Sequence, residues 1–252
     1  MIRPIFACTL AVLMTVPSLR AQSLLAVDFT DAEIKSCKDG EMIGFGNSNA
    51  DHMTARLQVP NVEIRVGEAG GKHALEFVNN GTEWGQAGAV KTIPPEVGTK
   101  ESLELRGTVV FTPLSVSGGR GIFQIALNSG NWVTTSSSVT AVHLSVESNL
   151  GLKYVSDTGA RTVAKLEPGS RYRIDFCANF SNPQQNTWEF ALSHDDGGDA
   201  APIFSSGPLN TRAPHIVPGL FALGCGVGSG SSTEPFVQIH SVKLSEAEVA
   251  KN

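Results

Sequence analysis

Three separate segments, 103–111, 139–147 and 171–180, alternate apolar and polar residues. Successive side chains of a β-strand point to opposite faces of a sheet, so this alternation describes strands with one face in a core and one in water. An amphipathic helix would instead repeat its apolar residues every three or four positions. On one face the last segment carries Tyr172, Ile174, Phe176, Ala178 and Phe180. The three segments therefore predict antiparallel sheets that each bury one face.

Short apolar runs separated by turn residues continue along the whole chain, which holds 26 Gly and 13 Pro in 252 residues. This spacing is typical of an all-β sandwich. The only helical signal is in the tail, where Ser245 is an N-cap residue and Glu248 follows three positions later. We therefore expect two antiparallel sheets and a short C-terminal helix. The remaining predicted strands are 24–30, 62–66, 74–78, 122–127, 152–155, 187–193, 219–226 and 236–244.

The N-terminus has the pattern of a secretory signal peptide. Arg3 precedes an apolar run, and small residues lead to a cleavage site after Ala21. A buried N-terminal helix is the alternative interpretation. Residues 1–21 are thus predicted to be removed, which leaves no candidate membrane span and one domain over 22–252. The predicted location is extracellular, periplasmic or in the cell envelope.

Charge and cysteine content narrow the possible partners. Without Arg3 and Arg20, the chain has 17 basic and 24 acidic residues, which gives a formal charge of −7. No cluster of basic residues is present to predict nucleic-acid binding. Cys177 and Cys225 both lie in predicted strands and are the first candidates for a disulfide, with buried free thiols as the alternative. The chain has no Cys-x-x-C motif to indicate zinc or thiol-redox chemistry.

One region resembles the hairpin of concanavalin A-like and laminin-G-like jelly rolls found in secreted bacterial proteins. It combines Leu166-Glu-Pro-Gly-Ser-Arg-Tyr-Arg-Ile-Asp-Phe with Asn182-Pro-Gln-Gln-Asn-Thr-Trp-Glu-Phe-Ala-Leu. The segments Leu25-Ala-Val-Asp-Phe and Phe236-Val-Gln-Ile-His-Ser-Val-Lys-Leu are also similar to the first and last strands of that family, which commonly pair. The resemblance covers 24–244 and implies a single jelly-roll sandwich.

Catalytic groups of the family are matched only in part. Hydrolases on this fold carry two carboxylates in a Glu-x-Asp-x-Glu strand or a close variant; the chain has no such motif, and Glu246-x-Glu248 lies in the predicted tail helix. Jelly-roll alginate lyases are similar at Arg106 and Gln124, the positions that neutralise the uronate, but Ala126 stands where they have a histidine. His143 could replace that histidine, with Tyr154 as a fourth group. The alternative is that Arg106 and Gln124 are ordinary solvent-facing strand residues.

Carbohydrate binding requires aromatic faces and planar polar side chains. Trp84 and Trp132 lie in loops rich in Asn and Gly, whereas Trp188 alternates with apolar residues and is expected in the core. Either loop tryptophan could instead fold over the edge of the core. The predicted ligand-binding residues are Trp84, Trp132, Arg106, Gln124 and His143.

A structural calcium ion is the candidate cofactor, and a domain without any cofactor is the alternative. Asp195, Asp196 and Asp199 cluster in a turn without the spacing of an EF-hand, so a solvated hairpin tip is the alternative. His240-Ser241 stands where many domains of the family have an Asp-Asn pair beside structural calcium. The six histidines have no metal-ligand spacing.

These observations predict a secreted domain that recognises a polysaccharide or another glycan. The first alternative is a polysaccharide lyase or glycoside hydrolase using Arg106, Gln124, His143 and Tyr154. Convergence of these four side chains on one sheet face would favour that enzyme. A structural or adhesive envelope protein is the second alternative.

Overall fold

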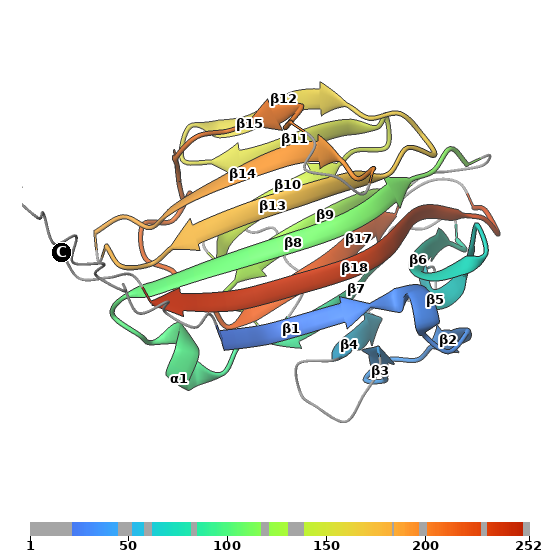
Figure 1. Ribbon diagram of the computed structural model, residues 1–252, viewed down its shortest axis with the longest axis horizontal. Coiled ribbons are helices and arrows are strands. Elements are labelled where there is room, and N and C mark those ends of the chain that lie inside the picture. Colours follow the sequence, from blue (N-terminus) through green and yellow to red (C-terminus); the bar gives the residue numbers. More distant parts are fainter. Residues whose placement is uncertain are drawn as a thin grey trace, which may run out of the picture.

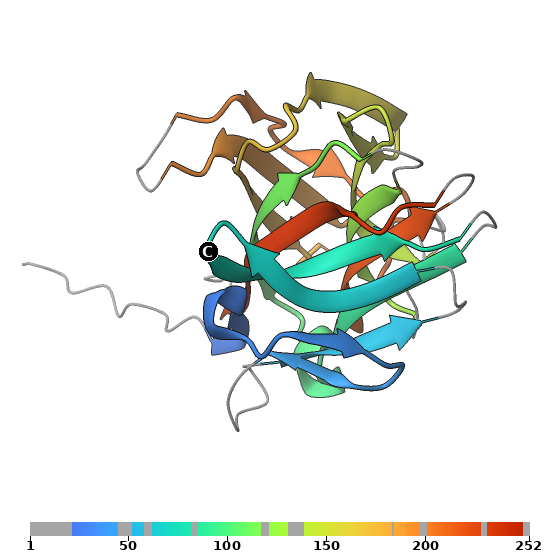
Figure 2. The ribbon, with the colours of Figure 1, turned by 90° about the vertical axis from the view of Figure 1, so that its right-hand side faces the viewer.

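A computed structural model of the protein describes residues 22–44, 52–57, 62–81, 85–116, 121–130, 139–182, 184–196, 201–227 and 231–248. The predicted signal peptide lies outside these residues. In this part of the chain, two antiparallel sheets stack face to face as a jelly-roll β-sandwich (Figures 1 and 2). The all-β prediction is confirmed. No described helix is long and apolar enough to cross a membrane.

The ten-stranded sheet, called sheet A below, has the order β15-β14-β13-β8-β18-β6-β5-β2, with β1 paired to β18 and β16 paired to β14. Figure 1 is viewed onto its outer face. Its strands are β1 (Gln22–Asp28), β2 (Lys35–Cys37), β5 (Val62–Ala69), β6 (Lys72–Asn79), β8 (Leu103–Pro113), β13 (Tyr172–Asn179), β14 (Thr187–His194), β15 (Phe204–Ser205), β16 (Leu209–Asn210) and β18 (Pro235–Glu248).

The eight-stranded sheet, called sheet B, has the order β12-β11-β10-β9-β17-β7-β4-β3. Two short helices, η1 (Phe29–Asp31) and α1 (Pro95–Gly98), lie in connections. The strands of sheet B are β3 (Met42–Gly44), β4 (His52–Leu57), β7 (Gly85–Thr92), β9 (Ile122–Asn128), β10 (Thr140–Val146), β11 (Gly151–Ser156), β12 (Gly159–Lys165) and β17 (Leu220–Val227).

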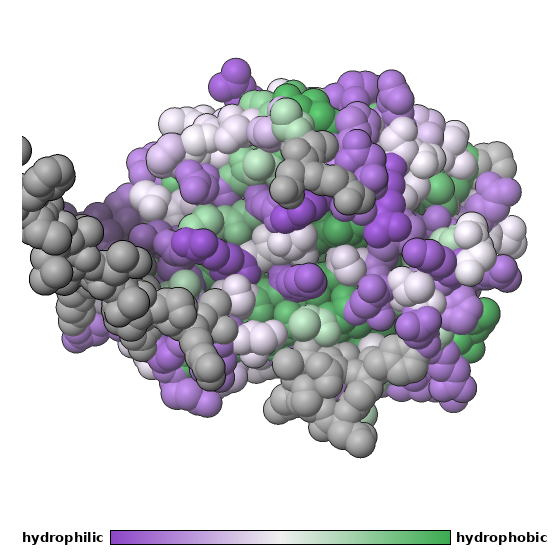
Figure 3. Space-filling model, viewed as in Figure 1, coloured by the Kyte–Doolittle hydropathy of each residue, from purple (hydrophilic) through white to green (hydrophobic). Residues whose placement is uncertain are grey.

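The hydrophobic core lies between the sheets and is filled from the alternating apolar positions. The rings of Phe176 on β13 and Phe221 on β17 stack across the interface with centroids 6.0 Å apart. Trp188 is 2% exposed and lies in this core, as predicted. The outer face of sheet A mixes hydrophilic and hydrophobic patches (Figure 3), so it is not a second continuous core.

The first and last strands pair, as the family resemblance implied. β1 runs antiparallel to the second half of β18, with Val27 opposite Val242. The first half of β18 pairs instead with β6, and its other edge pairs with β8 along most of its length. β18 therefore lies in the middle of sheet A and brings β6, β5 and β2 beside it.

Two sequence-based predictions are wrong. The predicted C-terminal helix is β-strand as far as Glu248, because Glu246 and Ala247 continue the ladder with β8; residues 249–252 lie outside the described part. Cys177 and Cys225 are both free thiols. They cannot pair as arranged because Cys177 lies on the outer side of sheet A, whereas Cys225 is fully buried in the core on sheet B.

Candidate functional site

A polar groove of about 610 Å³ lies on the outer face of sheet A, over the part formed by β2, β5, β6 and β18. Strand β5 alternates Val62, Ile64 and Val66 toward the core with Glu63 and Arg65 toward the groove. We call this feature the polar groove; its walls also include Leu114 and Ser115, which follow β8, and Glu234, which directly precedes β18.

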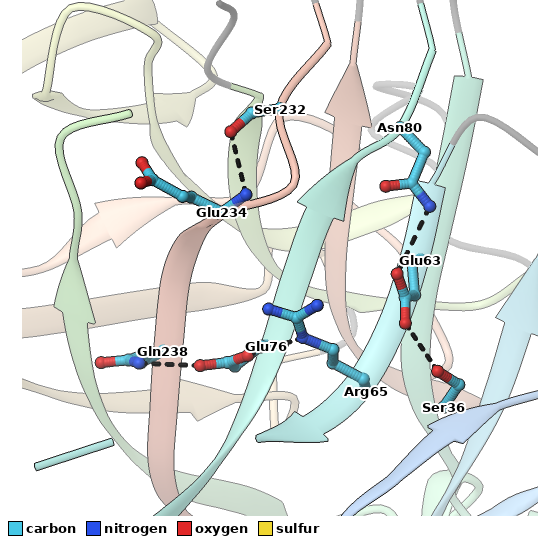
Figure 4. A network of polar contacts seen from close by, with 8 residues as sticks. All are labelled: Ser36, Glu63, Arg65, Glu76, Asn80, Ser232, Glu234 and Gln238. Atoms are coloured by element: carbon cyan, nitrogen blue, oxygen red, sulfur yellow. Dashed lines mark hydrogen bonds and ion pairs between the residues drawn. The ribbon is translucent and has the colours of Figure 1, made fainter. Parts of the chain in front are cut away.

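Strand register places three groove residues in one row across three strands. Gln238 on β18 lies opposite Glu76 on β6, and Glu76 lies opposite Arg65 on β5. Because residues directly opposite on one sheet face have neighbouring side chains, this register brings the amide, the carboxylate and the guanidinium together. Figure 4 shows them in line across the strands.

Glu76 is the central residue of the row, and both of its carboxylate oxygens are engaged. Gln238 donates from Nε2 to Oε1 at 2.7 Å, and Arg65 donates from Nε to Oε2 at 2.8 Å (Figure 4). Glu76 is only 3% exposed. Burial of a carboxylate is costly unless it is paired and hydrogen-bonded, so these two donors are what allow it to lie at the base of the groove.

A second carboxylate of the groove is oriented in the same way. Glu63 accepts a hydrogen bond from the hydroxyl of Ser36 at 2.6 Å and one from the amide of Asn80 at 3.4 Å (Figure 4). At the end of the groove the backbone N–H of Glu234 donates to the Ser232 hydroxyl oxygen at 3.0 Å. Two carboxylates of the groove, Glu76 and Glu63, are thus held in fixed orientations.

Gly67 makes room for the buried carboxylate. It lies next to the row on β5, and a Cβ atom built on it would be 2.3 Å from Oε2 of Glu76. Any larger residue would force the carboxylate away from its two donors. The packing of Glu76 therefore depends on a residue without a side chain at this position.

The predicted catalytic residues do not converge. Arg106 is on the outer face of sheet A, where its exposed side chain pairs with Glu104 at 2.5 Å. Gln124 and His143 lie on the outer face of sheet B, on neighbouring strands β9 and β10. Tyr154 is buried in the core, with its ring 5.7 Å from that of Phe190. The convergence that would favour a lyase or hydrolase is not found, because the four side chains belong to three different regions.

His143 is nevertheless unusual for a strand residue on an outer face. Its Nε2 is buried without a hydrogen-bond partner among the described residues. Burial, and then the positive charge of Lys153, lower the pKa of His143 to about 4. An imidazole that is neutral at neutral pH is a hydrogen-bonding group rather than a charged one.

The other predicted site residues divide into two sets. Trp84, Trp132 and Asp199 lie outside the described residues. Asp195 forms an ion pair with Arg171 at 2.6 Å, and Asp196 is exposed. Among the described residues, no group of three His, Cys, Asp or Glu side chains is placed to hold a metal ion.

Comparison with known proteins supports the fold. No protein-family model matches the sequence, and no curated protein matches it. Lectin II from Ulex europaeus has a similar structure, with a TM-score of 0.50, 11% identity and coverage of 83% of this chain and 100% of the lectin. This shows the architecture that the two chains share.

Two further solved structures are similar over more of the chain. A protein of unknown function from Shewanella oneidensis MR-1 has a TM-score of 0.52 and 13% identity, covering 93% of each chain. The CBM2 module of the evolved Dit of Lactobacillus casei BL23 phage J-1 has a TM-score of 0.50 and 12% identity, covering 92% of this chain and 99% of the module. At these identities the likeness is one of fold.

Proposed function

We propose that this protein recognises carbohydrate and binds a glycan chain in the polar groove. The observation that carries the proposal is the fixed row of Gln238, Glu76 and Arg65 at the base of a groove of about 610 Å³. Sugar hydroxyls both donate and accept hydrogen bonds, and planar amide, carboxylate and guanidinium groups suit them. The volume falls within the range usual for ligand sites.

The order within the groove supports binding rather than a merely solvated surface. Hydrogen bonds join the three side chains of the row, and Glu63 is separately hydrogen-bonded to Ser36 and Asn80. Groups held in place before binding lose little conformational freedom when a ligand arrives. The likeness in fold to a lectin and to a CBM2 module supports the proposal further, although one fold serves many functions and the site must decide.

Trp84 and Trp132 remain proposed contributors of aromatic faces. In the sequence, Trp84 lies four residues after Asn80, and the amide of Asn80 contacts Glu63 of the groove. Trp84→Ala should therefore weaken glycan binding. Unchanged binding in both Trp84→Ala and Trp132→Ala would contradict the loop contribution and leave the groove as the site.

The test is binding of the purified protein to a panel of polysaccharides, with new reducing or unsaturated ends assayed in the same wells. Binding without new ends supports recognition. New ends would show an enzyme. Binding to none of the polysaccharides would contradict the proposal and favour a structural or adhesive role.

A matched pair of variants locates the site. Gln238→Ala removes the donor that holds Glu76 and should reduce affinity, because the carboxylate is then no longer held in one orientation before the ligand binds. Gln124→Ala removes a glutamine that is also half-buried, from the outer face of sheet B. Loss of binding in Gln124→Ala with normal binding in Gln238→Ala would place the site on sheet B, near His143, instead.

We also infer that residues 1–21 are a signal peptide and that the protein acts outside the cytoplasm. The apolar run after Arg3 and the small residues before Gln22 support this. N-terminal sequencing of the protein from its producing cells should begin at Gln22. An N-terminus at Met1 would contradict it.

A further inference from the structure

The two η nitrogens of the Arg65 guanidinium make no hydrogen bond to another described residue. Its Nε is engaged by Glu76, and no other partner of this side chain occurs among the described residues. Figure 4 shows the two η nitrogens turned away from the Glu76 carboxylate, on the side of the row where Glu234 and Asn80 lie. The side chain is 30% exposed, so these donors are accessible from the groove.

Two η nitrogens in one plane form a fork that matches two acceptor oxygens held side by side. Such a pair of oxygens occurs in a carboxylate or phosphate, and also in two hydroxyls on adjacent ring carbons. The ion pair with Glu76 fixes the direction of the fork. Arg65 is therefore ready to bind one of these two kinds of oxygen pair.

The charge of the groove around Arg65 determines whether an anionic group or a pair of neutral hydroxyls is the favoured ligand. Four carboxylates line the groove, Glu63, Glu68, Glu76 and Glu234, against the two cations Arg65 and Lys35. Lys35 is directed in part to Glu41, 3.5 Å away, and to the carbonyl oxygen of Met42. An anionic ligand would enter beside an excess of negative charge, which opposes its binding. Neutral hydroxyls carry no such penalty, and their hydrogens can be donated to carboxylates.

We propose that the polar groove selects neutral glycans that carry two free hydroxyls on adjacent ring carbons, and that Arg65 binds the oxygens of both hydroxyls. This inference rests on the proposed function and specifies its ligand class. The fork donates to the two hydroxyl oxygens, and carboxylates such as Glu234 accept the hydroxyl hydrogens. Polymers of uronic acids are excluded by the charge of the groove.

The experiment compares related polymers with and without adjacent hydroxyls, and with and without charge, by calorimetric titration of the purified protein. A (1→4)-linked glucan has adjacent hydroxyls on its internal residues, whereas the isomeric (1→3)-linked glucan does not. The same (1→4)-linked glucan after periodate oxidation and borohydride reduction has lost them. Methyl-esterified polygalacturonate is the neutral counterpart of polygalacturonate.

The expected result is binding of the untreated (1→4)-linked glucan about tenfold or more tightly than the other two glucans, because a bidentate charge-assisted contact is lost. Binding of the methyl ester should likewise exceed that of the free acid. Equal binding of the (1→4)- and (1→3)-linked glucans, or preference for polygalacturonate, would overturn the inference while leaving carbohydrate recognition intact. Binding of no glycan at all would instead overturn the proposed function.

Two variants test the named residues by selectivity rather than by total affinity. Arg65→Lys keeps the charge but removes the fork, so the ratio between the two linkages should fall toward one. Glu234→Gln removes one exposed negative charge and should reduce the preference for the methyl ester over the acid. An Arg65→Lys variant that folds and keeps the full linkage ratio would refute the role of Arg65.

Discussion

Replacing Gly67 with alanine tests whether the row in the polar groove depends on this position. The new methyl group would lie 2.3 Å from Oε2 and 2.7 Å from Cδ of Glu76, and the three nearest atoms all belong to that side chain. The φ angle of Gly67 is not in the left-handed region, so alanine adds no backbone strain. The cost of Gly67→Ala therefore comes from displacing Glu76.

The magnitude follows from what Glu76 loses when it moves. Its hydrogen bond from Gln238 and its ion pair with Arg65 are both broken or lengthened. Hydrogen bonds to charged groups contribute about 1.5–3 kcal/mol, but Arg65 is 30% exposed, so solvent weakens its share. We expect Gly67→Ala to lower the free energy of unfolding by about 1–3 kcal/mol.

In a variant that lacks the Glu76 side chain, Gly67→Ala should raise the free energy of unfolding instead of lowering it. In a Glu76→Ala background the methyl group meets no carboxylate, and alanine then stabilises by about 0.4–1 kcal/mol by restricting the unfolded chain. Urea unfolding followed by tryptophan fluorescence gives all four corners of this double-mutant cycle. Gly226→Ala is the control, since nothing lies within 4 Å of a Cβ there. An equal effect of Gly67→Ala in both backgrounds would refute the reasoning.

Two further predictions concern groups outside the groove. Cys225→Ser places a hydroxyl in the core and should lower the free energy of unfolding by about 1–3 kcal/mol, whereas Cys177→Ser on the outer face should change it by less than about 0.5 kcal/mol. Both thiols are free, so alkylation of the denatured chain without reductant should modify both of them. Protection of the two cysteines from alkylation would show that they form a disulfide. Burial lowers the pKa values of His143 and His240 from 6.5 to about 4, so the unfolded chain binds protons that the native protein does not. The free energy of unfolding should therefore fall as the pH drops from 6.5 to 4, and His143→Gln should flatten this slope; an unchanged slope would show that His143 is not buried in its neutral form.

The sequence was most informative where one face of a strand is buried. Strands β8, β10 and β13 were predicted because their apolar residues alternate, and the structure places those residues in the core. Strand β12 was missed because neither of its faces is well buried. Strand β7 was missed because it is built from small residues such as Gly88 and Ala89, which have little β-propensity of their own.

The C-terminal tail shows how pairing overrides a local signal. Ser245 and Glu248 have the spacing of a helix cap, a preference worth about 1 kcal/mol. In the structure Ser245 lies opposite Arg106 on β8 and opposite Ser23 on β1, so the segment has partners on both edges. Backbone hydrogen bonds to two strands outweigh a single cap, and local spacing alone could not reveal those strands.

The polar groove could be predicted only in pieces. Arg65, Glu76 and Gln238 each fell within a predicted strand, on or beside its polar positions. What was missing was the order of the strands, because β18 comes from the end of the chain and lies beside β6 from its first third. Without the order of the strands, only motifs that are local in sequence can be recognised, such as the loop tryptophans and the partial catalytic motifs.

The hydrogen bonding of the two engaged carboxylates favours recognition over hydrolysis. A glycosidase needs one carboxylic acid that can give its proton to the leaving oxygen and a second carboxylate that is free to attack or to activate water. Both oxygens of Glu76 accept hydrogen bonds from Gln238 and Arg65, and both oxygens of Glu63 accept them from Ser36 and Asn80. Groups held in this way are fixed acceptors that orient a ligand, which is the role that recognition requires. The absence of new chain ends in the polysaccharide assay is therefore the result that this geometry leads us to expect.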